Sequence, residues 1–271
     1  MPNREIKPFE LAIVARSTAR LTLAELASLR KQPPASFAPK LSPLFLKHSD
    51  EQTLAAMAAL HQARVDFGLD SVDFGPWAIV SISRYMGRAA FATLRDRYSV
   101  DGAWGVSVQV IPHRTMHSVS GTISLGLGIH GPAIGVNGGI DADNTGLLSL
   151  ACIMSRGAWQ GVWLVCSHWS PEATVDQKGN IVSDSVCLAA ALALVPGDSP
   201  NPLGYIRFEA DDQLHRSAAT RQQALADPAV GLVEYILDDE RREADPQLWR
   251  RSTQTGLRIE VGLTAAAGVS P

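Results

Sequence analysis

The sequence lacks the features that would place it in a membrane or on nucleic acid. No apolar segment approaches the roughly 20 residues that a membrane-spanning helix needs, so we expect no membrane span. The net charge of −3 comes from scattered acidic and basic residues, which leaves no basic patch and predicts no nucleic-acid partner. The polar start, Met1–Lys7, has no hydrophobic segment of the kind found in signal peptides. A soluble, cytoplasmic protein is the expectation.

Cysteine is also scarce, and its three positions form no paired spacing. Cys152, Cys166 and Cys187 all stand in apolar surroundings, so neither a disulfide framework nor a zinc site is predicted. We expect all three to be buried structural cysteines, with Cys152 facing the core from a helix. Nucleotide-binding loops are missing too, because Gly126-Leu-Gly128 is only a weak echo of G-x-G-x-x-G and no P-loop occurs. No cofactor is expected.

What the sequence does have is one organised stretch in its centre. A turn at Gly131-Pro132 leads into a short apolar strand, Ala133–Val136, and then to the pair Gly138-Gly139. A helix with small and apolar residues is predicted over 141–157, and Val162–Cys166 is typical of a buried strand. Strand, tight turn, small-residue helix and strand are the parts of a nucleophile elbow, which presents one side chain at a helix N-terminus.

The apex of this elbow carries no nucleophile. No Cys or Ser occurs from Gly135 to Ala142, and the aliphatic Ile140 cannot form a covalent acyl intermediate. The polar side chains at the start of the following helix fit N-capping better than catalysis. These side chains are Asp141, Asp143 and Asn144.

The same stretch resembles the nucleophile region of the β-ketoacyl synthases, which have a thiolase-like fold. The family pattern is roughly Gly-Pro-Ser-x-x-Val-x-Thr-Ala-Cys, and Gly131-Pro132 and Val136 match it. The Thr-Ala-Cys triplet falls on Gly138, Gly139 and Ile140. Ile140 therefore stands where the family has its acyl-accepting cysteine.

The resemblance implies an α/β, thiolase-like fold, with a mixed five-stranded sheet and helices, similar to the N-terminal half of a ketoacyl synthase. It covers about residues 8–195 and includes an upstream Gly-x-Ile-Ser run at Gly121–Ser124. We therefore predict a synthase N-terminal-like domain at 1–195 and a C-terminal extension packed on it at 196–271. The boundary falls in the Pro- and Gly-rich run Pro196–Pro202. The roughly 70 residues beyond it are too few for a second half of ordinary domain size.

Patterning predicts the remaining elements. Apolar runs predict strands at Phe9–Arg16, Trp77–Ser83, Ser185–Leu194 and Gly204–Glu209. Helices are predicted at Leu23–Lys31, Lys47–Leu69 and Gly87–Tyr98, and in part of the charged region 211–251. By the resemblance, the strand at Ser185–Leu194 returns antiparallel into the sheet.

Histidines suggest further roles. His113 and His117 are four residues apart, which on a helix would place both on one face, but no third ligand lies nearby and no metal site is predicted. By the resemblance, the segment that contains His113 and His117 packs at a dimer interface and reaches toward the partner's acyl tunnel. His168 stands at the family's Gly-Gly-x-Glu turn, where it closes off the site or simply packs. The predicted tunnel or interface residues are Arg114, Thr115, Met116, His117, Gly138, Gly139, Ile140 and His168.

Three functional hypotheses follow. The first is a catalytically inactive synthase-like subunit, similar to chain length factors, that pairs with an active ketoacyl synthase in polyketide, aryl-polyene or fatty-acid-like synthesis. Such a pair would also meet an acyl carrier protein, and any activity of its own would be of the acyltransferase type. The second is a homodimer that holds an acyl or CoA-like ligand without turnover. The third is an enzyme with relocated chemistry, using for example His117 and Asp141.

Overall fold

The computed structural model describes residues 8–32, 41, 43–108, 110–139, 141–176, 181–182, 184–197, 199–210, 231–239, 248–253 and 257–264. Its strands are β1 (Phe9–Leu21), β2 (Trp77–Arg84), β3 (Ala133–Gly138), β4 (Gly161–Ser170), β5 (Val186–Pro196), β6 (Gly204–Ala210), β7 (Trp249–Ser252) and β8 (Leu257–Leu263). Its α-helices are α1 (Leu23–Leu29), α2 (Pro43–His48), α3 (Glu51–Asp66), α4 (Arg88–Asp101), α5 (Val110–Arg114), α6 (Ser118–Leu127), α7 (Ala142–Met154) and α9 (Leu232–Asp239). Two short 3-10 helices are η2 (Leu69–Ser71) and η3 (Gly102–Gly105).

The strands form one mixed sheet in the order β3-β2-β4-β5-β1-β6-β8-β7. β2 runs parallel to both β3 and β4, whereas β5 runs antiparallel to β4 and to β1. The first five strands in this order form the mixed five-stranded arrangement that the resemblance implies. The prediction of five strands is nevertheless too small, because β6, β8 and β7 continue the same sheet by antiparallel pairing.

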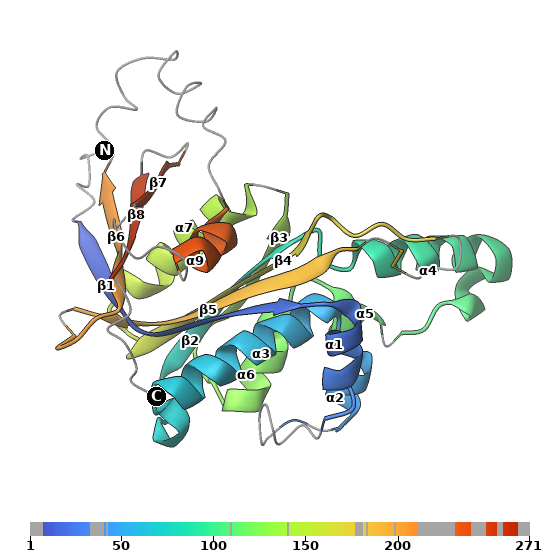
Figure 1. Ribbon diagram of the computed structural model, residues 1–271, viewed down its shortest axis with the longest axis horizontal. Coiled ribbons are helices and arrows are strands. Elements are labelled where there is room, and N and C mark those ends of the chain that lie inside the picture. The colour runs from blue at the N-terminus through green and yellow to red at the C-terminus, as the bar shows by residue number, and fades with distance from the viewer. Residues whose placement is uncertain are drawn as a thin grey trace, which may run out of the picture.

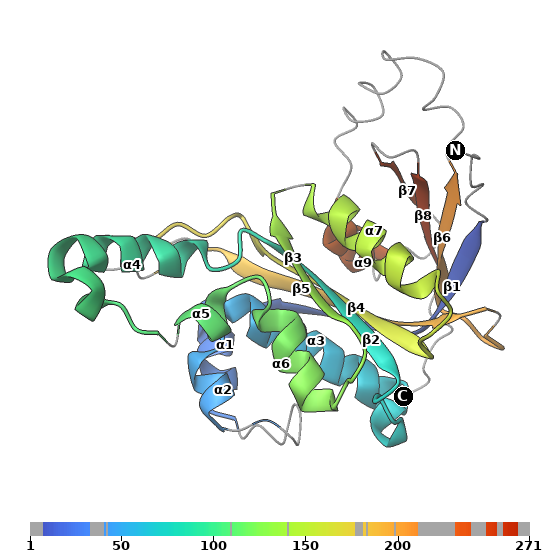
Figure 2. The same ribbon diagram turned by 180° about the vertical axis from the view of Figure 1, so that it is seen from behind.

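Helices cover both faces of the sheet (Figures 1 and 2). α3 and α6 lie on one face, and α7 and α9 lie on the other. Both faces of β5 are therefore buried, and its side chains divide between two apolar cores. Leu192 and Leu194 face α7 and α9, while Ala191 and Ala193 face α3. Small side chains on this second face let the alanine-rich α3 pack closely against the strand.

The predicted central elements are confirmed. β3, α7 and β4 follow one another as the sequence indicates, and α3 begins where Asp50 caps it by accepting a hydrogen bond from the Gln52 backbone N–H at 3.0 Å. The predicted strand at Ser185–Leu194 corresponds to β5 and is antiparallel to β4, as expected. Among the described residues, no helix combines the length and the apolar character needed to cross a membrane.

One burial prediction is wrong. Cys152 is exposed, whereas Cys166 and Cys187 are buried as predicted. The core stripe of α7 is formed by Leu147, Leu150 and Ala151. Successive residues of a helix are rotated by roughly 100° about its axis. Cys152 is one residue after the buried Ala151 and therefore faces solvent.

Candidate functional site

The carboxyl ends of β2, β3 and β4 meet at one edge of the sheet because these strands are parallel. This edge is where ligands bind in many α/β proteins. Here the apolar strands end in polar residues, with Ser83 and Arg84 closing β2 and Ser167 and His168 near the end of β4. Gly138 closes β3 at the same edge.

A charged network occupies this edge. The Arg84 guanidinium donates from Nη2 to Oδ2 of Asp143 at 3.0 Å and from Nη1 to Oε1 of Glu234 at 3.0 Å. Nε2 of His168 lies 2.9 Å from the same Glu234 oxygen. Asp143 is supplied by α7 and Glu234 by α9, so the network joins β2, β4 and two helices.

Hydrogen bonds extend the network toward α3. The hydroxyls of Ser83 and Ser167 lie 3.1 Å apart, and Ser167 donates to Oε1 of Gln52 at 3.2 Å. Gln52 in turn donates from Nε2 to the Arg84 carbonyl at 2.9 Å. We name this set the edge cluster. Its members are Gln52, Ser83, Arg84, Asp143, Ser167, His168 and Glu234.

The charged forms of Glu234 and Arg84 are favoured within the edge cluster. Burial alone would raise the pKa of Glu234, but its contact with His168 and the positive charge of Arg84 outweigh burial and lower that pKa to about 2. Burial likewise disfavours the charged guanidinium of Arg84, yet Asp143 and Glu234 raise its pKa above the ordinary value. The cluster is thus a set of mutually compensated charges and not a free acid or base.

The backbone around this edge is tightly packed. Tyr85 adopts a left-handed conformation with φ of 50°, and its N–H donates to the Gly138 carbonyl at 3.0 Å. A Cβ added at Gly139 would lie 3.0 Å from the Tyr85 hydroxyl. A Cβ added at Gly231, the residue before α9, would lie only 1.9 Å from Nη2 of Arg84. A bare backbone is therefore required where α9 meets the arginine.

The buried thiols are poorly suited to nucleophilic chemistry. Burial is the main cause that raises the pKa of Cys166 well above its usual value, and the negative charge of Asp143 adds to it. Burial also raises the pKa of Cys187 well above the usual value. Since the thiolate is the reactive form, both side chains remain inert thiols at neutral pH.

The predicted interface segment lies along β3. Arg114 ends α5, and its Nη1 lies 3.9 Å from Oε2 of Glu51. Thr115 donates its N–H to the Ser118 hydroxyl at 2.9 Å. The backbone of Met116 passes so close to β3 that a Cβ added at Gly135 would lie 2.0 Å from the Met116 carbonyl oxygen.

The structure separates the predicted residues into two groups. Gly138, Gly139 and His168 lie at the carboxyl edge, while the segment from Arg114 to His117 lies beside β3, with Met116 and His117 exposed. Ile140 lies outside the described residues.

His113 and His117 do not share one helix face. His113 is buried in α5, and His117 precedes α6. Burial and the nearby His48 lower the pKa of His113. In the described part of the chain, no group of three or more His, Cys, Asp or Glu side chains could hold a metal ion.

Several cluster members were not predicted from the sequence as site residues. Arg84 and Gln52 stand at the ends of predicted elements, and such a polar residue directly after a buried strand is the signal that could have found Arg84. The capping role predicted for Asp143 is wrong, because its Oδ2 accepts from Arg84 and from the Leu232 N–H, both at 3.0 Å. Glu234 stands in a region with no recognisable motif.

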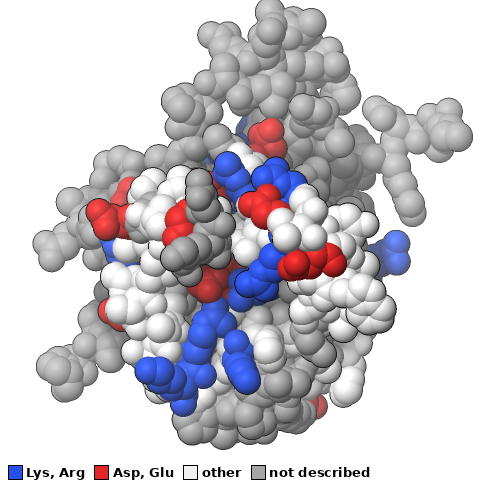
Figure 3. All heavy atoms as spheres, turned by 90° about the vertical axis from the view of Figure 1, so that its right-hand side faces the viewer, with Lys and Arg blue, Asp and Glu red and all other residues white. Residues whose placement is uncertain are grey.

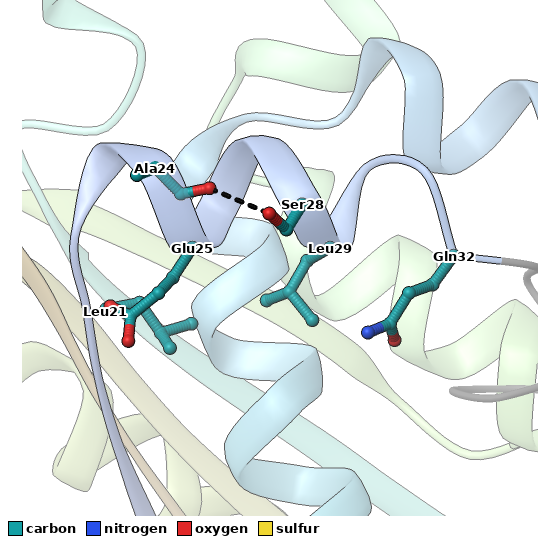
Figure 4. Close-up of a pocket in the computed structure, with 6 residues that line it drawn as sticks. All are labelled: Leu21, Ala24, Glu25, Ser28, Leu29 and Gln32. Atoms are coloured by element: carbon teal, nitrogen blue, oxygen red, sulfur yellow. Dashed lines mark hydrogen bonds between the residues drawn. The ribbon is translucent and has the colours of Figure 1, made fainter.

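A surface hollow also lies beside α1 (Figure 4). It is lined by Leu21, Ala24, Glu25, Ser28, Leu29 and Gln32. Glu25 is already engaged, because its carboxylate accepts from the N–H of Thr22 at 2.8 Å in a capping box. No member of the edge cluster lines this hollow, and we assign it no role.

Comparison with known proteins places the fold. No protein-family description and no curated protein matches the chain. Solved structures do match. The AntDE:AntF structure, a type II PKS acyl-carrier protein in complex with its ketosynthase bound to the hexaketide, aligns with a TM-score of 0.56 and 12% identity over 95% of this chain and 99% of that chain.

Two further structures align almost as completely. The ishigamide ketosynthase/chain length factor gives a TM-score of 0.52 and 13% identity over 94% of this chain and 99% of that chain. The ketosynthase ApeO in complex with its chain length factor ApeC from Xenorhabdus doucetiae gives a TM-score of 0.51 and 15% identity over 93% of this chain and 98% of that chain. At these identities the similarity establishes the fold, so the chain has a ketoacyl-synthase-like, thiolase-type fold.

Proposed function

We propose that the protein is a catalytically inactive ketoacyl synthase-like subunit of the chain length factor type. It pairs with an active synthase in polyketide, aryl-polyene or fatty-acid-like synthesis. Residues 1–195 supply the synthase-like part and residues 196–271 an extension packed on it. The observation that carries the proposal is the near-complete alignment, over both chains, with chains from ketosynthase and chain length factor complexes.

The chemistry of the carboxyl edge supports an inactive subunit. A ketoacyl synthase by the family route needs a nucleophile directly after β3, and the sequence from Gly135 to Ala142 contains neither Cys nor Ser. At the same edge, Arg84 is paired with two carboxylates, and α9 brings Glu234 into contact with His168. Because Glu234 is engaged by both Arg84 and His168, it is not available as a free base at this edge.

The sheet also offers a place for a partner. β3 is the last strand on its side of the sheet, and among the described residues it pairs only with β2. Its outer edge can therefore accept a strand from another subunit. The segment from Arg114 to His117, where the resemblance expects a dimer interface, packs against the face of the same strand at Gly135. An acyl carrier protein is a further partner that we infer for the assembled pair, because such a protein is part of the AntDE:AntF complex.

Native mass spectrometry of the protein purified from its own host tests the pairing. We expect a one-to-one complex with a larger synthase that carries a catalytic cysteine. Incubation of this complex with an acyl donor should add the acyl mass to the synthase and not to this chain. Recovery of a homodimer without a synthase would contradict the proposal and favour the ligand-binding alternative. A stable acyl adduct on this chain would contradict its inactivity.

A further inference from the structure

A helical arm projects from the body of the protein. We name residues 88–108, which comprise α4, η3 and the three residues after them, the arm. Figures 1 and 2 show α4 extending away from the sheet, beyond α5. No residue of α4 is buried. The backbone at the base of the arm is closely packed, because a Cβ added at Gly87 would lie 2.2 Å from the Arg114 carbonyl oxygen.

The arm exposes large apolar side chains. Trp104 is 99% exposed, Val100 83% and Val108 78%. The arm also carries the exposed rings of Phe91 and Tyr98. Four of the other five tryptophans of the chain are buried, so the exposure of Trp104 is unusual within this fold. They are Trp77, Trp163, Trp169 and Trp249. A cluster of exposed aromatic and aliphatic side chains on one projection is typical of an interaction site.

We propose that the arm is the element by which this chain grips the synthase subunit, with Trp104 as the anchor. The proposal rests on the function proposed above. The base of the arm contacts Arg114, which begins the segment that packs against the face of β3 at Gly135. The arm therefore begins beside a segment that packs on β3, and β3 is the strand at this end of the sheet. Tryptophan is among the residues that most often dominate the binding energy of protein interfaces.

The size of the surface favours a large protein partner. A stable interface buries roughly 800 Å² on each partner. The outer edge of β3 is only six residues long, or about 20 Å, and a narrow strand edge of that length does not supply such an area. α4 adds a helix of 14 residues, about 21 Å long. A partner that covers both the strand edge and the arm can reach the area that a stable pair needs.

The charges on this side favour a folded protein over an anionic surface. The arm carries Arg88, Arg95 and Arg97 together with Asp96 and Asp101. Figure 3 views the molecule from the side on which the arm projects and shows basic, acidic and uncharged side chains intermixed. A membrane or a strongly acidic partner is usually met by charges of one sign. A mixed rim around exposed aromatic residues is the anatomy of a protein interface.

The test compares binding of the purified synthase by this chain and two variants. Trp104→Glu changes the anchor, and Val65→Glu changes an exposed apolar residue at the far end of α3. We expect Trp104→Glu to weaken the complex at least about 30-fold, as for a hot-spot residue, and Val65→Glu to leave it unchanged. Both variants should fold, since their side chains are exposed, and an unchanged unfolding midpoint verifies this.

A second measurement uses tryptophan fluorescence. In the free chain, iodide should quench Trp104, and binding of the synthase should protect it. The variant Trp104→Phe has no tryptophan at this position, so binding of the synthase should no longer reduce iodide quenching. Most of the affinity for the synthase should be retained.

The outcomes separate the two proposals. If a synthase binds and Trp104→Glu binds it as tightly as the unchanged chain, the arm is not the grip, although the proposed function stands. If only a homodimer forms and Trp104→Glu dissociates it, the partner that binds the arm is a second copy of this chain. Both the assignment of a synthase partner and the proposed function would then be wrong.

Discussion

Arg84 bridges two carboxylates that lie 59 and 150 residues further along the chain. The Asp143 side chain is 1% exposed and the Arg84 side chain 13% exposed, so neither charge can be satisfied by water alone. Removing one partner of such a pair leaves the other buried without compensation, and this is more harmful than the pair is stabilising. The free energy of unfolding should therefore be sensitive to this one side chain.

We expect Arg84→Met to lower the free energy of unfolding by about 3–5 kcal/mol. Urea denaturation measures the loss. The matched control is Arg207→Met, which removes an arginine with an exposed ion pair to Glu10 and should change stability by less than about 1 kcal/mol. Equal, small losses in both variants would show that the edge cluster is not a buried charge network.

Asp50 gives a prediction about pH. Its burial and the neighbouring charge of Glu51 raise its pKa from 3.8 to about 7. Because the folded protein holds this proton more tightly than the unfolded chain does, the contribution of Asp50 to stability falls as pH rises between these two values. The slope is at most roughly 1.4 kcal/mol per pH unit.

Asp50→Asn should remove this slope. Asparagine keeps the N-cap of α3 but carries no charge, so the variant should be more stable than the unchanged chain at pH 8 and similar to it near pH 4. Thermal unfolding across this range measures the difference. Asp96→Asn alters an exposed carboxylate and serves as the control. A variant curve parallel to that of the unchanged chain would contradict the assignment.

At the scale of elements, polar contacts add to the apolar packing that holds α9 on the sheet. Glu234 contacts both Arg84 and His168, and Leu232 donates its backbone N–H to Asp143. The pKa of Glu234 is depressed to about 2. Its contribution to stability is therefore complete above the ordinary carboxyl pKa and is lost as the pH falls through 2.

Glu234→Gln should loosen this helix. Hydrogen exchange of the α9 amides should become about tenfold faster at neutral pH, while exchange in α3 stays the same. Glu209→Gln, which changes a carboxylate on β6, is the control. The difference between the Glu234 variant and the unchanged chain should shrink in strongly acidic solution, where the native carboxylate is itself protonated. Unchanged exchange in α9 would show that apolar packing alone holds the helix.

Two glycines near the predicted interface segment form a matched pair. A Cβ at Gly135 would meet the Met116 carbonyl at 2.0 Å, whereas a Cβ at Gly121 in α6 would meet nothing within 4 Å. Gly135→Ala should lower the free energy of unfolding by about 1–3 kcal/mol through overpacking. Gly121→Ala should raise it by about 0.5–1 kcal/mol through helix propensity. Urea denaturation distinguishes the two signs, and a neutral Gly135→Ala would place Met116 away from β3.

The elements that the sequence predicted are those with a strong local signal. β2 and β4 are continuous apolar runs, and α3 has a cap and is rich in apolar residues, so each could be recognised alone. β8 has an alternating pattern that is a local signal as well, but its pairing with β6 joins segments separated by a long charged region. That pairing depends on the tertiary structure and is not visible in a short stretch of sequence.

The same distinction applies to the site. His168, Gly138 and Gly139 belong to the stretch whose resemblance to the ketoacyl synthases implies a site. Glu234 reaches the edge cluster only because α9 packs beside α7 on the sheet. The sequence around Glu234 contains no motif that predicts this contact. Cys152 was misplaced by a different cause, since a one-residue shift on a helix exchanges the buried face for the exposed one.

At the scale of the whole molecule, the three cysteines report on different parts of the fold. Cys152 lies on the exposed side of α7, while Cys166 and Cys187 lie in the central strands β4 and β5. The two buried thiols belong to opposite cores, because Cys166 packs with the α7 and α9 layer and Cys187 with the α3 layer. A thiol reagent can therefore distinguish local opening of one layer from opening of the whole sheet.

In the native protein we expect a maleimide to label Cys152 rapidly and the other two cysteines at least roughly a thousandfold more slowly, because burial and a raised thiol pKa both oppose reaction. Mass spectrometry of the intact protein over time follows each addition. Cys152→Ser should remove the fast addition. If Cys166 and Cys187 react together, the eight-stranded sheet opens as one unit. Early labelling of Cys166 alone would show that the α9 layer detaches first. Labelling of all three at one fast rate would contradict the two-core packing itself.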